Sequence, residues 1–227
     1  MSPRITVVVA TGNRGKLREL SAIFADLPIE LVPMTEVLPA PIHIVEDGVT
    51  FEENARKKGS IVANATMLLT LADDSGLEVD ALGGRPGVRS ARFAHEKATD
   101  AENNAALLEA LQEVDDDART ARFRCVLALF DPWAAPGESP VLADGTCEGV
   151  IAREGRGAGG FGYDPLFLVK ELGNRSMAEL SDDEKNAVSH RGRAAKNLLP
   201  KMRSIVLARL DDVERVSRRR PSIHVDR

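Results

Sequence analysis

The protein has 227 residues, of which 43% are hydrophobic and 29% are charged, and its formal net charge at pH 7 is −5. This length and composition are typical of a globular protein with one large domain or two small ones. The acidic balance excludes the broad basic surface that general nucleic-acid binding needs, so an anionic substrate would have to meet a local cluster of Lys and Arg.

The cysteine content and the lack of long apolar runs indicate in which cellular compartment the protein is expected. Cys125 and Cys147 are the two cysteines, and they lack metal-ligand spacing, which predicts reduced thiols. The sequence shows no signal peptide and no apolar run of membrane-spanning length. We therefore expect a soluble cytoplasmic protein without a membrane partner.

The first elements of the chain read as strand, turn and helix. Residues 4–10 are β-branched and almost wholly apolar, which predicts a strand buried on both faces. Thr11-Gly12-Asn13 leads into a helix expected over residues 14–25, and a glycine turn before a helix presents backbone N–H groups to anions. Residues 29–32 are expected to form a short strand, and residues 33–41, with three prolines, a connector.

Later helix starts are indicated by capping boxes, in which Ser or Thr is followed three residues later by Glu. These are Thr50 with Glu53, Thr99 with Glu102, and Ser181 with Glu184. Further strands are expected near residues 77–79, 121–130 and 140–153, the last two as a hairpin around residues 131–137. Because strands and helices interleave, the predicted fold class is α/β with a mixed sheet.

The segment 211–227 is charged, contains Arg218-Arg219-Arg220-Pro221 and lacks an apolar stripe. We expect a poorly ordered tail there, after a single domain over residues 1–210. Nucleic-acid binding by the arginine cluster is an alternative, but a solvated tail is the simpler interpretation.

An apolar run over residues 67–72 ends in Asp73-Asp74-Ser75-Gly76. Ionised Asp side chains resist burial unless they are paired or hold a cation, so we expect them at a strand end beside a cleft. Successive strand side chains point to opposite faces, so one carboxylate can face a ligand while the other braces the loop. The same residues are ordinary turn formers, and this stretch alone does not decide between a turn and a site.

Three basic residues lie on or beside apolar helical stripes, where each needs a partner. Lys16 shares the apolar side of its helix and opposes the macrodipole, so a bound anion explains it better than stability does. Lys58 lies with Asn54 at a stripe margin, either as a snorkelling residue or as a cation aimed into a site. Arg191 lies in the stripe of the last helix, where the usual partner is a carboxylate or a base edge. Lys185 lies off that stripe.

Two glycine motifs fail on context. Residues 157–162 match G-x-G-x-x-G, but residues 163–167 do not read as the helix that the dinucleotide fingerprint requires. Residues 12–17 echo a P-loop, but the glycine spacing is too short and Ser/Thr is missing after the lysine. What remains is a flexible glycine loop that delivers Phe161, Tyr163 and Asp164 together, suited to stacking on a base and reading its edge. Core packing of Phe161 is an equal alternative.

Five sequence blocks in register resemble the inosine/xanthosine triphosphate pyrophosphatase family over about residues 5–200. They are TGNRGK at 11–16, EDGVTFEENA at 46–55, ADDSGL at 72–77, GGFGYDP at 159–165 and SHRG at 189–192, and residues 82–93 look like a further block. The resemblance implies a Mg²⁺-dependent enzyme that cleanses the nucleotide pool by hydrolysing non-standard purine nucleoside triphosphates (ITP, dITP and XTP) to the monophosphate and pyrophosphate. It also implies an elongated mixed sheet flanked by helices, with two lobes around a central substrate cleft, and a homodimer.

The resemblance also implies roles by position. Glu46 and Asp74 would bind the metal, Asp74 would accept a proton, and Asp73 and Lys58 would support catalysis. Asp47 beside Glu46 leaves open which carboxylate binds the metal. The implied substrate-binding residues are Thr11, Gly12, Asn13, Arg14, Gly15, Lys16, Asn54, Ser75, Phe161, Gly162, Tyr163, Asp164, Lys185, His190 and Arg191.

These residue types suit the implied chemistry. Mg²⁺ prefers a few carboxylates with phosphate oxygens, and lysines offset the charge that develops when a phosphoanhydride is cleaved. A 6-oxo base would accept a hydrogen bond from Arg191 or His190, whereas adenine would present a donor to a donor. That argument does not explain the rejection of guanine, which is also a 6-oxo base. The alternatives are a related nucleotide pyrophosphatase with another base preference and a regulator that binds nucleotides without turnover.

Overall fold

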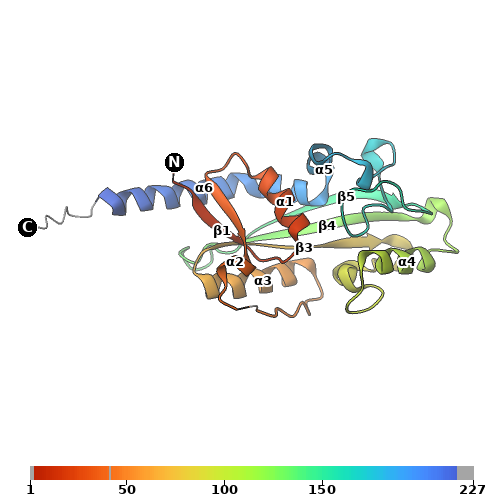
Figure 1. Cartoon of the computed structure of the whole chain (residues 1–227), viewed down its shortest axis with the longest axis horizontal. Helices are drawn as coiled ribbons and strands as arrows, with labels where there is room; N and C mark the ends of the chain where they lie inside the picture. The colour runs from red at the N-terminus through yellow and green to blue at the C-terminus, as the bar shows by residue number, and fades with distance from the viewer. Residues whose placement is uncertain (1–2, 41, 219–227) are drawn as a thin grey trace, which may run out of the picture.

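In a computed structural model that describes residues 3–40 and 42–218, the strands form one seven-stranded mixed sheet in the order β2-β1-β3-β4-β5-β6-β7 (Figure 1). β1 pairs in parallel with β2 and β3, and the other neighbouring pairs are antiparallel. The predicted α/β class with a mixed sheet is therefore confirmed. The strands are β1 (Ile5–Val9), β2 (Ile29–Pro33), β3 (Leu69–Val79), β4 (Thr120–Phe130), β5 (Val141–Ile151), β6 (Phe167–Val169) and β7 (Arg175–Ser176).

Three helices begin where the capping residues predict. The side chain of Thr50 accepts a hydrogen bond from the N–H of Glu53, and Thr99 and Ser181 each form a complete capping box. A short helix lies inside the expected connector, whose Pro41 is outside the described residues. The helices are α1 (Arg14–Ile23), α2 (Met34–Val37), α3 (Phe51–Thr66), α4 (Asp100–Ala110), α5 (Asp182–Val188) and α6 (His190–Arg218).

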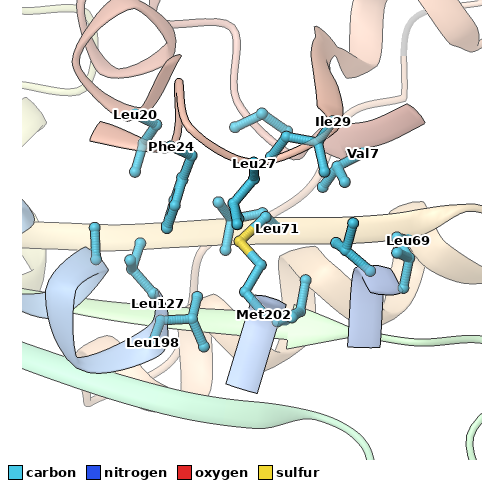
Figure 2. Close-up of a cluster of buried hydrophobic side chains, with 14 of the residues drawn as sticks. Val7, Leu20, Phe24, Leu27, Ile29, Leu69, Leu71, Leu127, Leu198 and Met202 are labelled. Carbon is cyan, nitrogen blue, oxygen red and sulfur yellow. The ribbon is translucent and has the colours of Figure 1, made fainter. Parts of the chain in front are cut away.

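Helices cover both faces of the sheet. On one face, α1 and α6 enclose a core in which Leu20, Phe24 and Met202 pack against Leu71 and Leu127 (Figure 2). On the other face, α3 packs its own apolar side onto β1, β3 and β4. A separate apolar cluster at the far end of β3–β5 includes residues of α4 and β6. The antiparallel β3, β4 and β5 thus extend through both ends of an elongated molecule (Figure 1).

The strand β3 is longer than predicted, and this corrects the expected position of the two aspartates. Asp73 and Asp74 lie in the middle of β3 rather than at a strand end, and Ser75 and Gly76 continue the strand instead of turning. β4 pairs with β3 along residues 70–79. Buried carboxylates are tolerated at mid-strand only when they are paired, and the ion pairs described below supply those partners.

The end of the chain also differs from the prediction. α6 continues to Arg218, so residues 211–218 are helical where a disordered tail was expected. Arg209 connects this part of α6 to the β4–β5 hairpin through Asp131, at 2.5 Å, and pairs with Asp212 one turn later, at 3.3 Å. Such i,i+3 pairs support a helix without an apolar stripe. The rest of the predicted tail, 219–227, lies outside the described residues. None of the described helices is long and apolar enough to span a bilayer.

Candidate active site

The site forms where β1 ends beside β3. β1 pairs with β3 only at residues 69–71, whereas β4 follows β3 as far as Val79. The edge of β3 at Asp73 and Asp74 therefore lies beside the turn that enters α1 rather than beside another residue of β1. Because strand side chains alternate, Asp73 faces α1 and α6 while Asp74 faces α3. The predicted division of the two carboxylates between opposite faces is observed.

Asp73 is the fully buried member of the pair. Lys16 Nζ lies 2.5 Å from its Oδ1, and Arg191 Nε donates to its Oδ2 at 2.7 Å. Burial alone would raise the pKa of Asp73, but Arg191 and Lys16 lower it by more than burial raises it. The net pKa of Asp73 is therefore well below its usual range. The thiol of Cys125 donates to the same carboxylate, and burial beside Asp73 raises the thiol pKa well above normal. Asp73 is therefore an ionised carboxylate, and Cys125 stays protonated.

A chain of alternating charges continues from Asp73. Arg191 also donates to Glu19 of α1, and Lys185 of α5 contacts Glu19 at 2.8 Å and Asp164 at 2.6 Å. Burial raises the pKa of Asp164, although Lys185 opposes this. The network connects α1, β3, α5, α6 and the glycine loop, so the positions of these elements depend on one another.

A cavity of about 140 Å³ opens beside this network. The ring of Phe161 forms one wall, with Lys185 Nζ 4.7 Å and Arg191 Cζ 5.6 Å from its centroid. A Cβ on Gly15 would lie 2.9 Å from the same ring, so only glycine allows this approach. Ten of the predicted substrate-binding residues line the cavity: Asn13, Lys16, Ser75, Phe161, Gly162, Tyr163, Asp164, Lys185, His190 and Arg191.

The remaining predicted substrate-binding residues lie elsewhere around the site. Thr11, Gly12 and Arg14 line a separate depression that shares Asn13 with the cavity. Asn54 lies on the far side of β3, beside Asp74. The cavity is further lined by residues that sequence reasoning did not select: Gly76, Ser90, Ala91, Asp100, Asn103 and Phe123.

On the opposite face of β3, Lys58 contacts the carboxylates that are expected to bind the metal. Its Nζ lies 2.8 Å from Asp74 Oδ1 and 2.8 Å from Glu46 Oε1, and it donates to the carbonyl of Asp73. Burial raises the pKa of Asp74 despite Lys58, whereas for Glu46 burial is outweighed by Lys58 and the pKa is lowered. Asp47 instead pairs with Lys57 on the surface. The structure thus brings Glu46, not Asp47, to Asp74.

The donor set on this side suits Mg²⁺. Glu46 and Asp74 contact the same ammonium group, so their carboxylates lie close together. No group of three or more His, Cys, Asp and Glu side chains arranged for a metal occurs within residues 3–40 and 42–218. Mg²⁺ is usually held by one or two carboxylates, with waters and substrate phosphates completing its shell, and this pair fits that pattern.

Residues 7–201 match the model of the Ham1 family. The chain belongs to the Ham1 family. A dITP/XTP pyrophosphatase of Geobacter sulfurreducens is 54% identical over 188 residues, covering 83% of this chain and 92% of that protein. Another dITP/XTP pyrophosphatase, from Escherichia coli (strain K12), is 47% identical over 198 residues, covering 87% of this chain and 98% of that protein.

Solved structures of Ham1 proteins share the fold. A HAM1 protein from Coxiella burnetii has a TM-score of 0.77 at 45% identity and covers 87% of this chain and 98% of its own. A nucleoside-triphosphatase / dITP/XTP pyrophosphatase from Mycobacterium abscessus has a TM-score of 0.68 at 43% identity, covering 86% and 100%. The family resemblance seen in the sequence blocks is thereby confirmed.

Sequence reasoning missed Glu19, which links Arg191 to Lys185 in this Ham1 protein. A signal was present, because a helical wheel puts Glu19 about 60° from Lys16, at the edge of the stripe. The two aromatic residues of the glycine loop both line the cavity but differ in their surroundings. Phe161 is half-buried in the cavity wall, whereas Tyr163 packs in the far core and donates its hydroxyl to the carbonyl of Ser90.

His190 gives the Ham1 cavity its unsatisfied polar group. Its ring stacks on Phe123 at 4.7 Å, and its buried Nδ1 has no hydrogen-bond partner among the described residues. Burial, reinforced by Arg191, holds the pKa of His190 well below its usual range, so the imidazole is neutral. A buried nitrogen without a partner is the kind of group that a bound ligand satisfies.

The buried neutral His190 predicts a pH dependence of stability. Below about pH 6.5 the unfolded chain binds a proton on this residue that the folded chain does not, so stability is lost as pH falls. As pH falls below this value, the free energy of unfolding of wild type is expected to drop by up to about 1.4 kcal/mol per pH unit more than that of His190→Gln. Urea unfolding at pH 7.5, 6.5 and 5.5 measures this. Parallel pH profiles for the two proteins would contradict it.

Proposed function

We propose that this protein hydrolyses dITP, XTP and ITP to the nucleoside monophosphate and pyrophosphate, and so removes non-standard purine nucleotides from the pool. The observation that carries the proposal is the pairing of two sites across one strand. A cavity lies on the Asp73 side of β3 and contains His190 Nδ1, which has no hydrogen-bond partner within the part of the chain that the structure describes; the Lys58 cluster lies on the Asp74 side. The dITP/XTP pyrophosphatases that match most of the chain support the same substrate class.

In this proposal, the residues on the Asp74 side of β3 carry out the hydrolysis of the phosphoanhydride. Mg²⁺ bound at Glu46 and Asp74 would neutralise phosphate charge and polarise the phosphoanhydride. Asp74 orients the attacking water and accepts its proton, which its raised pKa favours. Lys58 fixes the orientation of Asp74, and both Lys58 and Lys16 offset the negative charge that develops on the triphosphate. The turn at residues 11–13 and the first residues of α1 hold the phosphate chain beside Lys16.

The base is enclosed on the Asp73 side. His190 Nδ1, when it carries the proton, can donate to a 6-oxo group, and Phe161 supplies a ring face for stacking. Arg191 lines the cavity, but its guanidinium already donates to Asp73, Glu19 and Ser75. His190 is therefore the group that adenine, with a donor at position 6, would leave unpaired.

Pyrophosphate release from dITP, XTP, ITP, dGTP, dATP and dTTP, each with and without Mg²⁺, tests the function. We expect metal-dependent release from the first three nucleotides and weak release from the others. Release from all six would favour a pyrophosphatase with a broader base preference. Tight dITP binding without turnover would instead favour a nucleotide-binding regulator.

We also propose that the active form is a cytoplasmic homodimer. The family resemblance supports the dimer, and two free, buried thiols are compatible with a reducing compartment. Sedimentation equilibrium of the full chain measures the assembly, and a single monomeric species at micromolar concentration would contradict it.

A further inference from the structure

Two side chains on one face of α4 form hydrogen bonds with both the backbone N–H and the backbone carbonyl of Gly162 in the glycine loop. The N–H of Gly162 donates to Asp100 Oδ2 at 2.7 Å, and Asn104 Nδ2 donates to the carbonyl of Gly162 at 2.9 Å. Asp100 and Asn104 are four residues apart, so their side chains lie on the same side of the helix. We infer that Asp100 and Asn104 are positioning residues that fix the wall of the base cavity.

The loop needs such support because it is rich in glycine and forms no helix or strand. Gly160 and Gly162 adopt φ values of +75° and +62°, and residues 157–163 belong to no helix or strand. Glycine loses more conformational freedom on ordering than any other residue. Beyond the α4 pair, the N–H of Gly159 donates to the carbonyl of Ala178, the N–H of Phe161 donates to Asp164, and the hydroxyl of Tyr163 donates to the carbonyl of Ser90. The α4 pair anchors the peptide that joins these two aromatic residues.

The anchored peptide bears directly on the cavity. Gly162 and Asp100 both line it, and Phe161, next to Gly162, forms the wall beneath Lys185 and against Gly15. A shift of Gly162 would therefore move the ring of Phe161 and change the width available to a base. This role rests on the proposed function, in which the loop encloses the nucleotide base.

The same contacts are not needed to form α4. Its N-terminus is capped by Thr99 and Glu102, and it is attached to the rest of the protein by Leu107 in the core and by buried Asn103. Asn103 bonds to the backbone of residues 91 and 94. Asp100 is exposed and Asn104 is half-buried. Loss of either should therefore loosen the loop while α4 stays in place.

Four variants test the inference, with Glu109→Ala, exposed on the same helix, as the matched control. Loss of one positioning hydrogen bond in Asp100→Ala or Asn104→Ala is expected to raise the KM for dITP about fivefold to tenfold. The kcat should stay within about twofold, because the Asp74 side is untouched. Asp100→Asn keeps an acceptor oxygen and should stay near wild type. Asn104→Asp replaces the donor with an acceptor facing a carbonyl and should match or exceed the loss in Asn104→Ala.

The double variant Asp100→Ala/Asn104→Ala adds a further check. Both side chains act on Gly162, so the KM of the double variant should rise by less than the product of the single effects. Single variants that behave like Glu109→Ala would overturn the inference, as would equal losses in Asp100→Asn and Asp100→Ala. A KM rise that follows a matching fall in Tm would also overturn it, because it would indicate a purely structural role. Absence of pyrophosphate release from dITP by wild type would instead refute the proposed function itself.

Discussion

Asp74→Asn is expected to lower kcat for dITP by about 10³-fold. An amide cannot accept the proton of the attacking water, and it is a weaker ligand for Mg²⁺ than a carboxylate. The fold should survive, because Asn has the same shape, its oxygen can still accept from Lys58, and Glu46 remains paired with Lys58; the hydrogen bond from Asn54 Nδ2 is lost. Burial already raises the pKa of Asp74, so removing this charge costs little stability. Steady-state kinetics and thermal unfolding of the variant measure both effects.

Asp47→Asn is the matched control for this variant. Asp47 is adjacent to Glu46 but pairs with exposed Lys57, away from Asp74. We expect it to retain nearly wild-type kcat. Full activity in Asp74→Asn would remove Asp74 as proton acceptor and metal ligand. A comparable loss in Asp47→Asn would show that activity depends on the charge of the surrounding loop rather than on this carboxylate.

Arg191→Ala is expected to destabilise the protein by about 3 kcal/mol and to lower Tm by roughly 10 °C. The guanidinium is buried between two carboxylates, Asp73 and Glu19, and removing it leaves each with one partner fewer. Lys16 and Lys185 still contact those carboxylates, which keeps the loss at the low end for a broken buried ion pair. Urea and thermal unfolding at pH 7.5 provide the measurement.

Arg193→Ala gives the comparison on the same helix. Arg193 pairs with exposed Glu171, and surface pairs contribute about 1 kcal/mol or less. Equal stability of the two variants would contradict a structural role for Arg191. The ratio of dITP to dATP hydrolysis by Arg191→Ala reports base selectivity only when the variant is folded. The two nucleotides must therefore be compared well below the Tm of the variant.

Local patterns predicted most of the elements of this fold. The apolar run at residues 4–10, the capping residues Thr50, Thr99 and Ser181, and the turn of the hairpin at residues 131–137 are each recognised from neighbours in sequence, and each corresponds to an observed element. The resemblance between separated blocks selected candidate residues, and the structure puts these residues on both sides of β3.

The length of β3 could not be predicted in the same way. Whether Asp73 can be buried at mid-strand depends on Arg191, which is 118 residues away in sequence, and on Lys16 from the first helix. No local window contains both partners. The contact between Asp100 and Gly162, 62 residues apart, escapes prediction for the same reason. The helical end of α6 was missed because its support comes from charge pairs and Asp131 rather than from a continuous apolar stripe.

The placement of Asp73 and Asp74 on opposite faces of β3 restricts how the chain can change in length. A one-residue insertion or deletion between Leu69 and Asp73 would shift the register and rotate every later side chain to the other face. The carboxylates of Asp73 and Asp74 would then each point to the other face of the sheet, and neither would keep its present partners. The turn at residues 131–140 carries no such restriction, because added residues there leave the pairing of β4 with β5 intact. Tolerated insertions should therefore accumulate in that turn and be absent from β3.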